Sequence, residues 1–120
     1  MKTILAAAPL AALLGTAAMV SLAAPAGAAA DGATLFKQRC AMCHSGGPAG
    51  PELKGVYGRK AAAGEFRYSP ALAKSKITWS ATELDAYLAS PGKKVPGTRM
   101  AVGVTDAAQR KAIIDYLKSR

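Results

Sequence analysis

The chain has few of the side chains that bind metal ions or form disulfides. It contains two cysteines and one histidine among 120 residues. Two cysteines allow one disulfide at most, so disulfides cannot supply the framework of the fold. A structural zinc site needs four Cys or His ligands, and this chain has only three such residues. All three lie within the five residues "CAMCH", which therefore hold the only candidate site of this kind.

Residues 1–30 have the order typical of a secretory signal peptide, a positive end followed by an apolar run and then small residues. Lys2 gives the positive end, an Ala- and Leu-rich run without charged residues follows, and "APAGAAADG" closes the segment. Cleavage after Ala28 and cleavage after Ala30 both fit. An uncleaved membrane anchor is the alternative, because the run could span a bilayer, but no linker precedes the pattern that begins at Asp31. We therefore predict a periplasmic protein with one domain over residues 31–120.

Acidic residues are scarce as well: the chain has 7 Asp and Glu against 16 Lys and Arg, for a net charge of +9. A basic surface favours acidic partners, which can be nucleic acid, anionic lipid or an acidic protein face. An exported chain is not expected to meet nucleic acid, so we expect none. No block of five or six like charges is present, which argues against a disordered basic tail.

Three segments have the features of helices. Residues 31–40 place Phe36 and Cys40 on one face. Residues 80–91 begin with a Ser80/Glu83 capping box and end at a proline. Residues 105–120 begin at Thr105 or Asp106, and their apolar stripe contains Ile113, Tyr116 and Leu117.

The segments between these helices are long and rich in glycine and proline, and no strand pattern is convincing. They read "SGGPAGPELKG", "GRKAAAGEFRY" and "PGKKVPGTRM". Loops of this length in a small domain are usually functional. The fold class predicted is all-α, with three main helices and long loops around a cofactor that completes a small core.

The motif Cys40-x-x-Cys43-His44 is the signature of covalent c-type haem attachment. One helical turn sets two sulfurs at the separation of the two haem vinyl groups, and the next residue reaches the iron. A thioredoxin-like dithiol would follow a strand, which is absent here. A disulfide between the two cysteines would close a very small loop and would leave His44 unexplained.

A second axial ligand can be found by elimination. No other histidine exists, Met1 and Met19 lie in the signal segment, and Met42 lies inside the attachment turn. Met100, in "VPGTRM", remains. His44/Met100 ligation would raise the reduction potential and fill both axial positions, so the protein would carry electrons and would not be an enzyme.

The chain resembles class I cytochrome c, of the bacterial cytochrome c2 and mitochondrial kind, from Gly32 to Lys118. The resemblance rests on "CAMCH", "GPELKGVYGRK", "FRYSPAL", "ITW", "AYLASPGKKVPGTRM" and "AIIDYLK". It implies that Gly32 and Phe36 pack against Ile113 and Tyr116 of the last helix. It also implies one covalent haem c and transient association of a monomer with membrane complexes, such as a bc1 complex and a terminal oxidase.

The resemblance implies further cofactor-binding residues. The carbonyl oxygen of Pro51 would accept a hydrogen bond from the ring N–H of the ligand His44. Tyr87 would lie beside the methionine sulfur. The donors around the inner haem propionate and its polar network would be Arg59, Tyr68, Trp79 and Thr98.

Several positions depart from the family pattern. The loop from His44 to Pro51 is short, Leu72 stands where asparagine is frequent, Lys76 replaces a common glycine, and Val102 lies where a phenylalanine usually covers the haem edge. The basic residues that the resemblance places near this edge are Arg39, Lys93, Lys94 and Arg99, with Lys60 further away. A haem peroxidase or gas-binding protein, and a subunit bound permanently to one dehydrogenase, are the alternatives to a soluble carrier.

Overall fold

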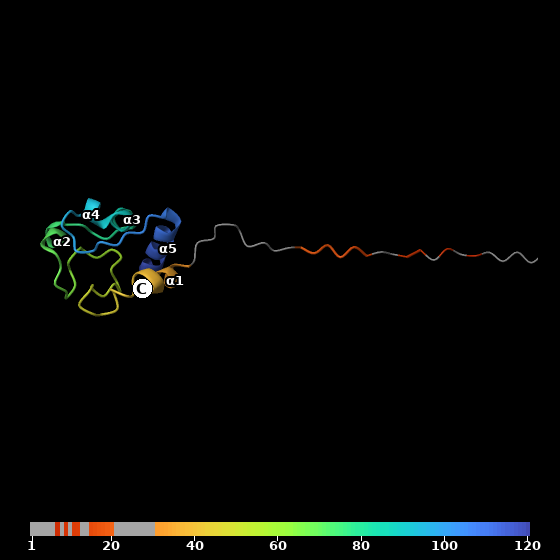
Figure 1. Ribbon diagram of the computed structural model, residues 1–120, viewed down its shortest axis with the longest axis horizontal. Coiled ribbons are helices and arrows are strands. Elements are labelled where there is room, and N and C mark those ends of the chain that lie inside the picture. Colours follow the sequence, from red (N-terminus) through yellow and green to blue (C-terminus); the bar gives the residue numbers. More distant parts are fainter. Residues whose placement is uncertain (1–6, 8, 10, 13–14, 21–30) are drawn as a thin grey trace, which may run out of the picture.

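The computed structural model describes residues 31–120, together with residues 7, 9, 11–12 and 15–20. The five helices of this part of the chain (Figure 1) are α1 (Gly32–Arg39), α2 (Pro70–Lys74), α3 (Ala81–Ala89), α4 (Pro91–Lys94) and α5 (Ala107–Lys118). Within the same residues the only β-type pairing is an isolated antiparallel bridge between Lys60 and Thr78. The all-α prediction is therefore confirmed.

The three predicted helices are present, and each begins at a side-chain cap. The amide of Thr34 donates to Asp31 Oδ1 at 2.8 Å, and the amide of Gln109 donates to Asp106 Oδ1 at 2.8 Å. Asp106, and not Thr105, is thus the cap of α5. In α3 the amide of Glu83 donates to Ser80 Oγ at 3.2 Å, but the Glu83 carboxylate pairs with Lys94 at 2.7 Å. Only half of the predicted capping box is therefore formed.

Two short helices were not predicted. Ser69 caps α2, accepting from the amide of Leu72 at 3.1 Å, and Pro70 occupies the first turn. Pro91 ends α3 as expected, but it also begins α4, inside a stretch predicted to be loop. A proline is tolerated at the start of a helix because its missing N–H is not needed there. Helices of four or five residues are too short to show a periodic apolar pattern, so the sequence could not reveal them.

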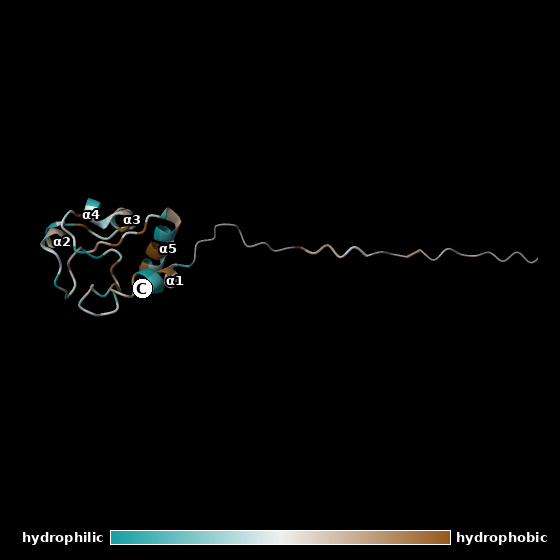
Figure 2. Ribbon diagram, in the orientation of Figure 1, coloured by the Kyte–Doolittle hydropathy of each residue, from teal (hydrophilic) through white to brown (hydrophobic). Residues whose placement is uncertain are grey.

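Helices α1 and α5 pack against each other, and α5 also contacts α3. A side chain at Gly32 would collide with the backbone of Ala112 and with Tyr116, so glycine allows the two backbones to approach. The rings of Phe36 and Tyr116 lie 5.3 Å apart. Figure 2 shows both hydrophobic and hydrophilic residues on α5, as expected for a helix with one buried face. The implied packing against Tyr116 is present, and Phe36 and Ile113 are both members of the buried core.

The buried core joins these helices to the loops. Its members are Leu35, Phe36, Val56, Trp79, Leu84, Tyr87, Leu88, Val95, Val104, Ile113, Ile114 and Leu117. The predicted apolar stripes of α3 and α5 lie in this core, except that Tyr116 is half-buried.

The predicted signal peptide lies mostly outside the described residues, and both candidate cleavage sites are among the undescribed ones. Among the residues that are described, no helix has the length and apolar character needed to cross a membrane.

Candidate functional site

The attachment motif continues the last turn of α1. The amide of Cys40 donates to the Phe36 carbonyl at 2.8 Å, and the amide of His44 donates to the Cys40 carbonyl at 2.9 Å. The motif is therefore one helical turn. Both thiols are free, with Cys40 half-buried and Cys43 exposed. Burial raises the pKa of the Cys40 thiol, an effect to which Cys43 adds and which Arg39 opposes.

The imidazole of His44 is oriented by the short loop that follows it. Its Nδ1 lies 2.8 Å from the carbonyl oxygen of Pro51. A carbonyl can only accept, so Nδ1 carries a proton, and a metal ion could be bound only by the second ring nitrogen. A Cβ on Gly50 would lie 2.9 Å from Nδ1 of His44 and 2.8 Å from the carbonyl oxygen of Cys43. The backbone at Gly50 thus closes on the ring and leaves no room for a side chain.

These residues line a cavity of about 490 Å³. All ten residues predicted to bind the cofactor or its iron lie on its wall, namely Cys40, Cys43, His44, Pro51, Arg59, Tyr68, Trp79, Tyr87, Thr98 and Met100. They come from loops and helices that are up to 60 residues apart in the chain.

The charged side chains that line this cavity are all basic. They are Arg39, Arg59, Lys60, Arg67 and Arg99. No acidic residue of the described chain is among the lining residues, and most of the remaining wall is apolar. Such a cavity suits a flat apolar ligand that carries negative groups.

A hydrogen bond links α3 to the segment after α4. Tyr87 and Thr98 share a hydrogen bond of 2.6 Å between their hydroxyl oxygens, and the rings of Tyr87 and Trp79 lie 4.9 Å apart. Burial raises the pKa of the Tyr87 phenol, although the bond to Thr98 acts in the opposite direction. The phenol therefore stays neutral at physiological pH and keeps its proton for hydrogen bonding.

The other predicted donors lie on the loop before α2. The amide of Gly64 donates to the hydroxyl of Tyr68 at 3.1 Å, which leaves the phenol proton free to be donated elsewhere. Arg59 reaches the carbonyl of Glu52 only at 3.5 Å, so most of its donors are available.

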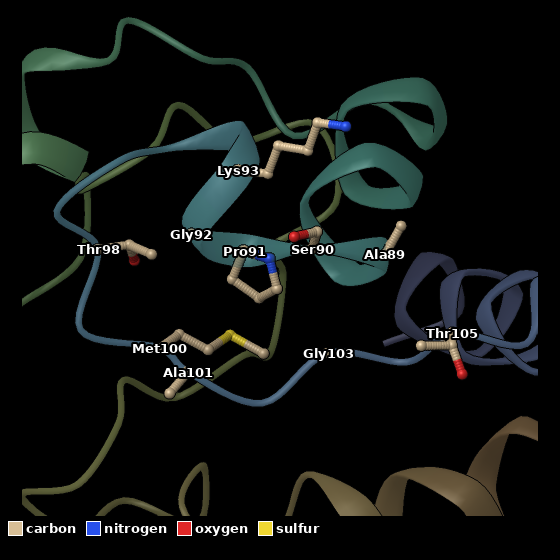
Figure 3. Close-up of a pocket in the computed structure, with 10 residues that line it drawn as sticks. All are labelled: Ala89, Ser90, Pro91, Gly92, Lys93, Thr98, Met100, Ala101, Gly103 and Thr105. Carbon is tan, nitrogen blue, oxygen red and sulfur yellow. The ribbon is translucent and has the colours of Figure 1, made fainter.

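Met100 lies on a coil that separates two hollows. We call residues 98–105 the Met100 segment. Thr98, Met100, Ala101 and Gly103 line the cavity of His44 and also a second hollow of about 590 Å³ next to α4 (Figure 3). In Figure 3 the Met100 side chain lies beneath Pro91. The segment is therefore a thin wall between the His44 cavity and the hollow next to α4.

Several features on this wall could not be assigned from the sequence. Arg67 was not singled out, because nothing in a loop sequence separates it from a solvated surface charge. Lys60 was expected to lie further from the haem edge than Lys93 and Lys94. It lines the cavity, whereas Lys93 and Lys94 do not. Lys94 instead pairs with Glu83.

Two of the noted departures have a structural counterpart. Val102 is 66% exposed, so it covers little of the cavity mouth. Lys76 has a φ of +53°, in the left-handed region, which explains why glycine is frequent at this position.

Comparison with known proteins assigns the family. The family model described as "Cytochrome c" matches residues 29–120. The chain belongs to the cytochrome c family. It is 43% identical over 100 residues to "Cytochrome c" from Theileria parva, covering 78% of this chain and 87% of that protein. It is 41% identical over 99 residues to "Cytochrome c" from Tetrahymena pyriformis, covering 79% of this chain and 91% of that protein.

A solved structure supports the same assignment. The "cytochrome cH from Methylobacterium extorquens" superimposes with a TM-score of 0.69 at 40% identity, covering 76% of this chain and all of that chain. Proteins of the cytochrome c family carry one covalently bound haem c and transfer electrons, and they are not enzymes. The resemblance, the class I fold, the cofactor and the non-enzymatic role predicted from the sequence are thereby confirmed.

The cavity of this chain fits such a group. Two free thiols and an oriented imidazole share one wall, the cavity is largely apolar, and five basic side chains could neutralise the two haem carboxylates. The backbone at Gly50 further favours a fixed imidazole ring.

Proposed function

We propose that this cytochrome c is a periplasmic carrier of single electrons in which His44 and Met100 are the axial ligands of the iron. The observation that supports this most directly is that both side chains line one cavity together with the two free cysteines. When bound, haem c supplies an iron centre that changes its charge by one electron.

His44 acts as a fixed, basic ligand. Its Nδ1 donates a hydrogen bond to the Pro51 carbonyl oxygen, with 2.8 Å between the two atoms. The imidazole therefore cannot easily rotate or change tautomer. A hydrogen bond of this kind also raises the basicity of the ligating nitrogen. Cys40 and Cys43 would hold the group by covalent bonds, because they lie in the same helical turn as His44.

Met100 supplies a soft thioether, which favours ferrous iron and raises the reduction potential. With His44 and Met100 both bound to the iron, small oxidants and gases would have no free site. Tyr87 shares a hydrogen bond with Thr98, two residues before Met100. This bond holds the start of the Met100 segment against α3.

The basic and hydroxyl-bearing side chains of the cavity hold the carboxylates. Arg59, Tyr68, Trp79 and Thr98 are the proposed donors, and Arg67 and Arg99 add positive charge on the same wall. Arginine suits this task because its planar guanidinium can donate two parallel hydrogen bonds to a carboxylate.

Spectra of the purified protein test the ligation. We expect a pyridine haemochrome spectrum of covalent c-type haem and a weak near-infrared band from sulfur-to-iron charge transfer. Met100→Ala should abolish this band and speed cyanide binding, whereas Met42→Ala, in an 88% exposed side chain, should change neither. A band that survives Met100→Ala would reject Met100 as ligand. Rapid carbon monoxide binding to the native ferrous protein would favour a gas-binding or peroxidase function instead.

The location and the partners form the second half of the proposal. Residues 1–30 would direct export and be removed, which N-terminal sequencing of the protein from a periplasmic fraction would test. The partners would be acidic faces of membrane complexes, such as a bc1 complex and a terminal oxidase, met by a monomer. The support is the net charge, which is +9 for the whole sequence and 15 − 7 = +8 without Lys2, and the position of exposed Arg39 and Arg99 on the cavity wall.

Charge reversal at matched positions tests docking. Arg39→Glu and Lys93→Glu should slow the second-order reaction with an acidic oxidase by about 10-fold or more at low salt, and the effect should shrink as salt rises. Lys111→Glu makes the same charge change two residues before the buried Ile113, hence on the outer face of α5, and should slow it far less. Lys94→Glu should act mainly on stability, because Lys94 is paired with Glu83. Equal rates for Arg39→Glu and Lys111→Glu would show that only net charge matters.

A further inference from the structure

The Met100 segment is held by few hydrogen bonds. It contains no helix, and its backbone is bonded to the rest of the chain near its two ends. At the start, the amide of Thr98 donates to the Val95 carbonyl at 3.0 Å; at the end, the amide of Val104 donates to the Leu88 carbonyl at 2.7 Å. Next to Met100, Nη1 of Arg99 donates to the Arg67 carbonyl oxygen at 2.8 Å. The Met100 side chain packs against the core on one side, but the segment borders the open hollow next to α4 on the other, so hydrogen bonds are needed to hold it.

Arg110, in the first half of α5, makes two hydrogen bonds to the end of this segment and one to α3. Its Nη1 donates to the carbonyl oxygens of Val104 at 3.0 Å and Thr105 at 2.9 Å. Its Nε donates to Asp85 Oδ1 on α3 at 2.8 Å. Arg110 therefore joins α5, α3 and the Met100 segment in one cluster.

Burial makes this cluster more than a surface contact. The Arg110 side chain is only 13% exposed, whereas that of Asp85 is 50% exposed. A charge removed from water needs hydrogen-bond partners, and the two carbonyls and the carboxylate supply them. The planar fork of arginine can reach all three at once, which a lysine ammonium on a similar stem cannot do.

The segment is also pressed against α3 next to this cluster. A Cβ at Gly103 would lie 3.0 Å from the Ala89 carbonyl oxygen and 3.1 Å from that of Leu88. The end of the segment thus packs closely against the last turn of α3. Arg110 donates hydrogen bonds to the carbonyl oxygens of the two residues that follow Gly103.

We propose that Arg110, oriented by Asp85, is a positioning residue that keeps the Met100 segment seated and so keeps the Met100 sulfur in the haem cavity. This inference rests on the proposed ligation by Met100. The bonds of Arg110 hold the end of the segment opposite to the Tyr87–Thr98 bond, so that the thin wall is fixed at both ends.

The binding of imidazole to the oxidised holoprotein tests this, because imidazole can bind only when the sulfur has left. Arg110→Met keeps the apolar stem and removes every donor. It should raise the imidazole affinity about tenfold and weaken the near-infrared band, as the charged hydrogen bonds to the segment are lost. Lys111→Met is the matched control, since Lys111 is 77% exposed and bonds only Asp115 on its own helix. It should change the affinity less than about twofold.

Two further variants separate positioning from general stability. Arg110→Lys keeps the charge but loses the fork, and should resemble Arg110→Met in imidazole affinity. Asp85→Asn leaves Arg110 in place and should raise the affinity by about two- to threefold, since only the orienting charge is lost. Should Arg110→Met fail to fold, Asp85→Asn carries the test, and an unchanged affinity in that variant overturns the proposal.

The outcomes also separate this inference from the ligation on which it rests. If Arg110→Met lowers the denaturation midpoint but leaves the imidazole affinity and the near-infrared band unchanged, Arg110 only joins helices and the inference is wrong. If instead the band survives Met100→Ala, the ligation itself is wrong, and both proposals fail.

Discussion

The two proposed ligands of the iron are held in different ways. His44 lies in a helical turn that continues α1, and its ring is fixed by Pro51, seven residues away. Met100 lies in a coil between two hollows, held at its ends by residues of α3 and α5. The first arrangement is local in sequence, whereas the second depends on contacts across the whole fold.

The two sides are therefore expected to differ in how readily they unfold locally. A helical turn with a short loop closes at low entropic cost, so the His44 side can form early and persist. The Met100 side requires α3 and α5 to be in place, because its hydrogen bonds to Tyr87, Leu88 and Arg110 come from these helices. Local opening is therefore expected on the Met100 side before the His44 side, as segments with few buried contacts open at the lowest free energy.

The largest effect, on the yield of holoprotein, is expected from removing one of the two cysteines that would attach the haem beside His44. Cys40→Ala removes one attachment point, and the yield of folded holoprotein should fall several-fold, because a domain of this size has little core without its cofactor. The measurement is haem absorbance per milligram of purified chain. Met42→Ala alters the same turn at an exposed position and should leave the yield unchanged. A normal yield for Cys40→Ala would show that this side does not depend on both thiols.

A smaller effect is expected from crowding the imidazole. Gly50→Ala places a methyl group 2.9 Å from His44 Nδ1, and the required shift should cost about 1–3 kcal/mol in the free energy of unfolding. Gly47→Ala is the control in the same loop, because nothing lies within 4 Å of a Cβ there. Denaturant unfolding followed by far-UV circular dichroism measures both. Equal stabilities of the two variants would mean that the loop moves aside freely and that the His44 side is not rigid.

The Tyr87–Thr98 bond gives a smaller effect on the Met100 side. Tyr87→Phe and Thr98→Val each remove one partner of the 2.6 Å bond, and a double-mutant cycle should give a coupling of about 1 kcal/mol. The near-infrared band should weaken in both variants while the visible bands of the haem stay similar. Additive changes in the free energy of unfolding would show that this bond does not hold the segment.

The smallest effect is expected at Lys76, which belongs to neither side. Lys76→Gly relieves a φ of +53° and should stabilise the fold by about 0.5–1 kcal/mol. Lys74→Gly removes the same charge from the last residue of α2, where glycine is unfavourable, and should destabilise it. Neither variant should change the near-infrared band. A shift of that band in Lys76→Gly would link this loop to the Met100 side, and the comparison of two separate sides would have to be revised.

The same contrast explains how much the sequence could predict. The residues proposed for the His44 side could be predicted from the sequence, because they lie close together in the chain and C-x-x-C-H is a specific pattern. Met100 was predicted as a ligand by elimination among four methionines, and Tyr87 and Thr98 were predicted near it, but the residues that hold the far end of its segment were not predicted. Arg110 and Asp85 are 25 residues apart, and in the sequence each looks like an ordinary surface charge on an amphipathic helix. Only the crossing of α3 and α5 brings them together.

Charge pairing was the other property hidden from the sequence. Lys94 was expected to face a partner, yet it is half-buried against Glu83. Glu83 was expected to complete a capping box, which its partner now prevents. A side chain that can make two interactions chooses between them through tertiary geometry, and a linear pattern contains no information on that geometry.

The basic lining of the cavity has a consequence for how the protein is made. Five positive side chains surround a space of about 490 Å³ with no acidic residue among the described lining residues. In a chain that has not yet received its cofactor these charges repel one another, and compaction would bring them closer together. We therefore expect the newly made polypeptide to remain open, salt-sensitive and easily cut by proteases. Attachment of a cofactor with two carboxylates then offsets part of this positive charge and fills the core in the same event, so we expect maturation and folding to be a single step.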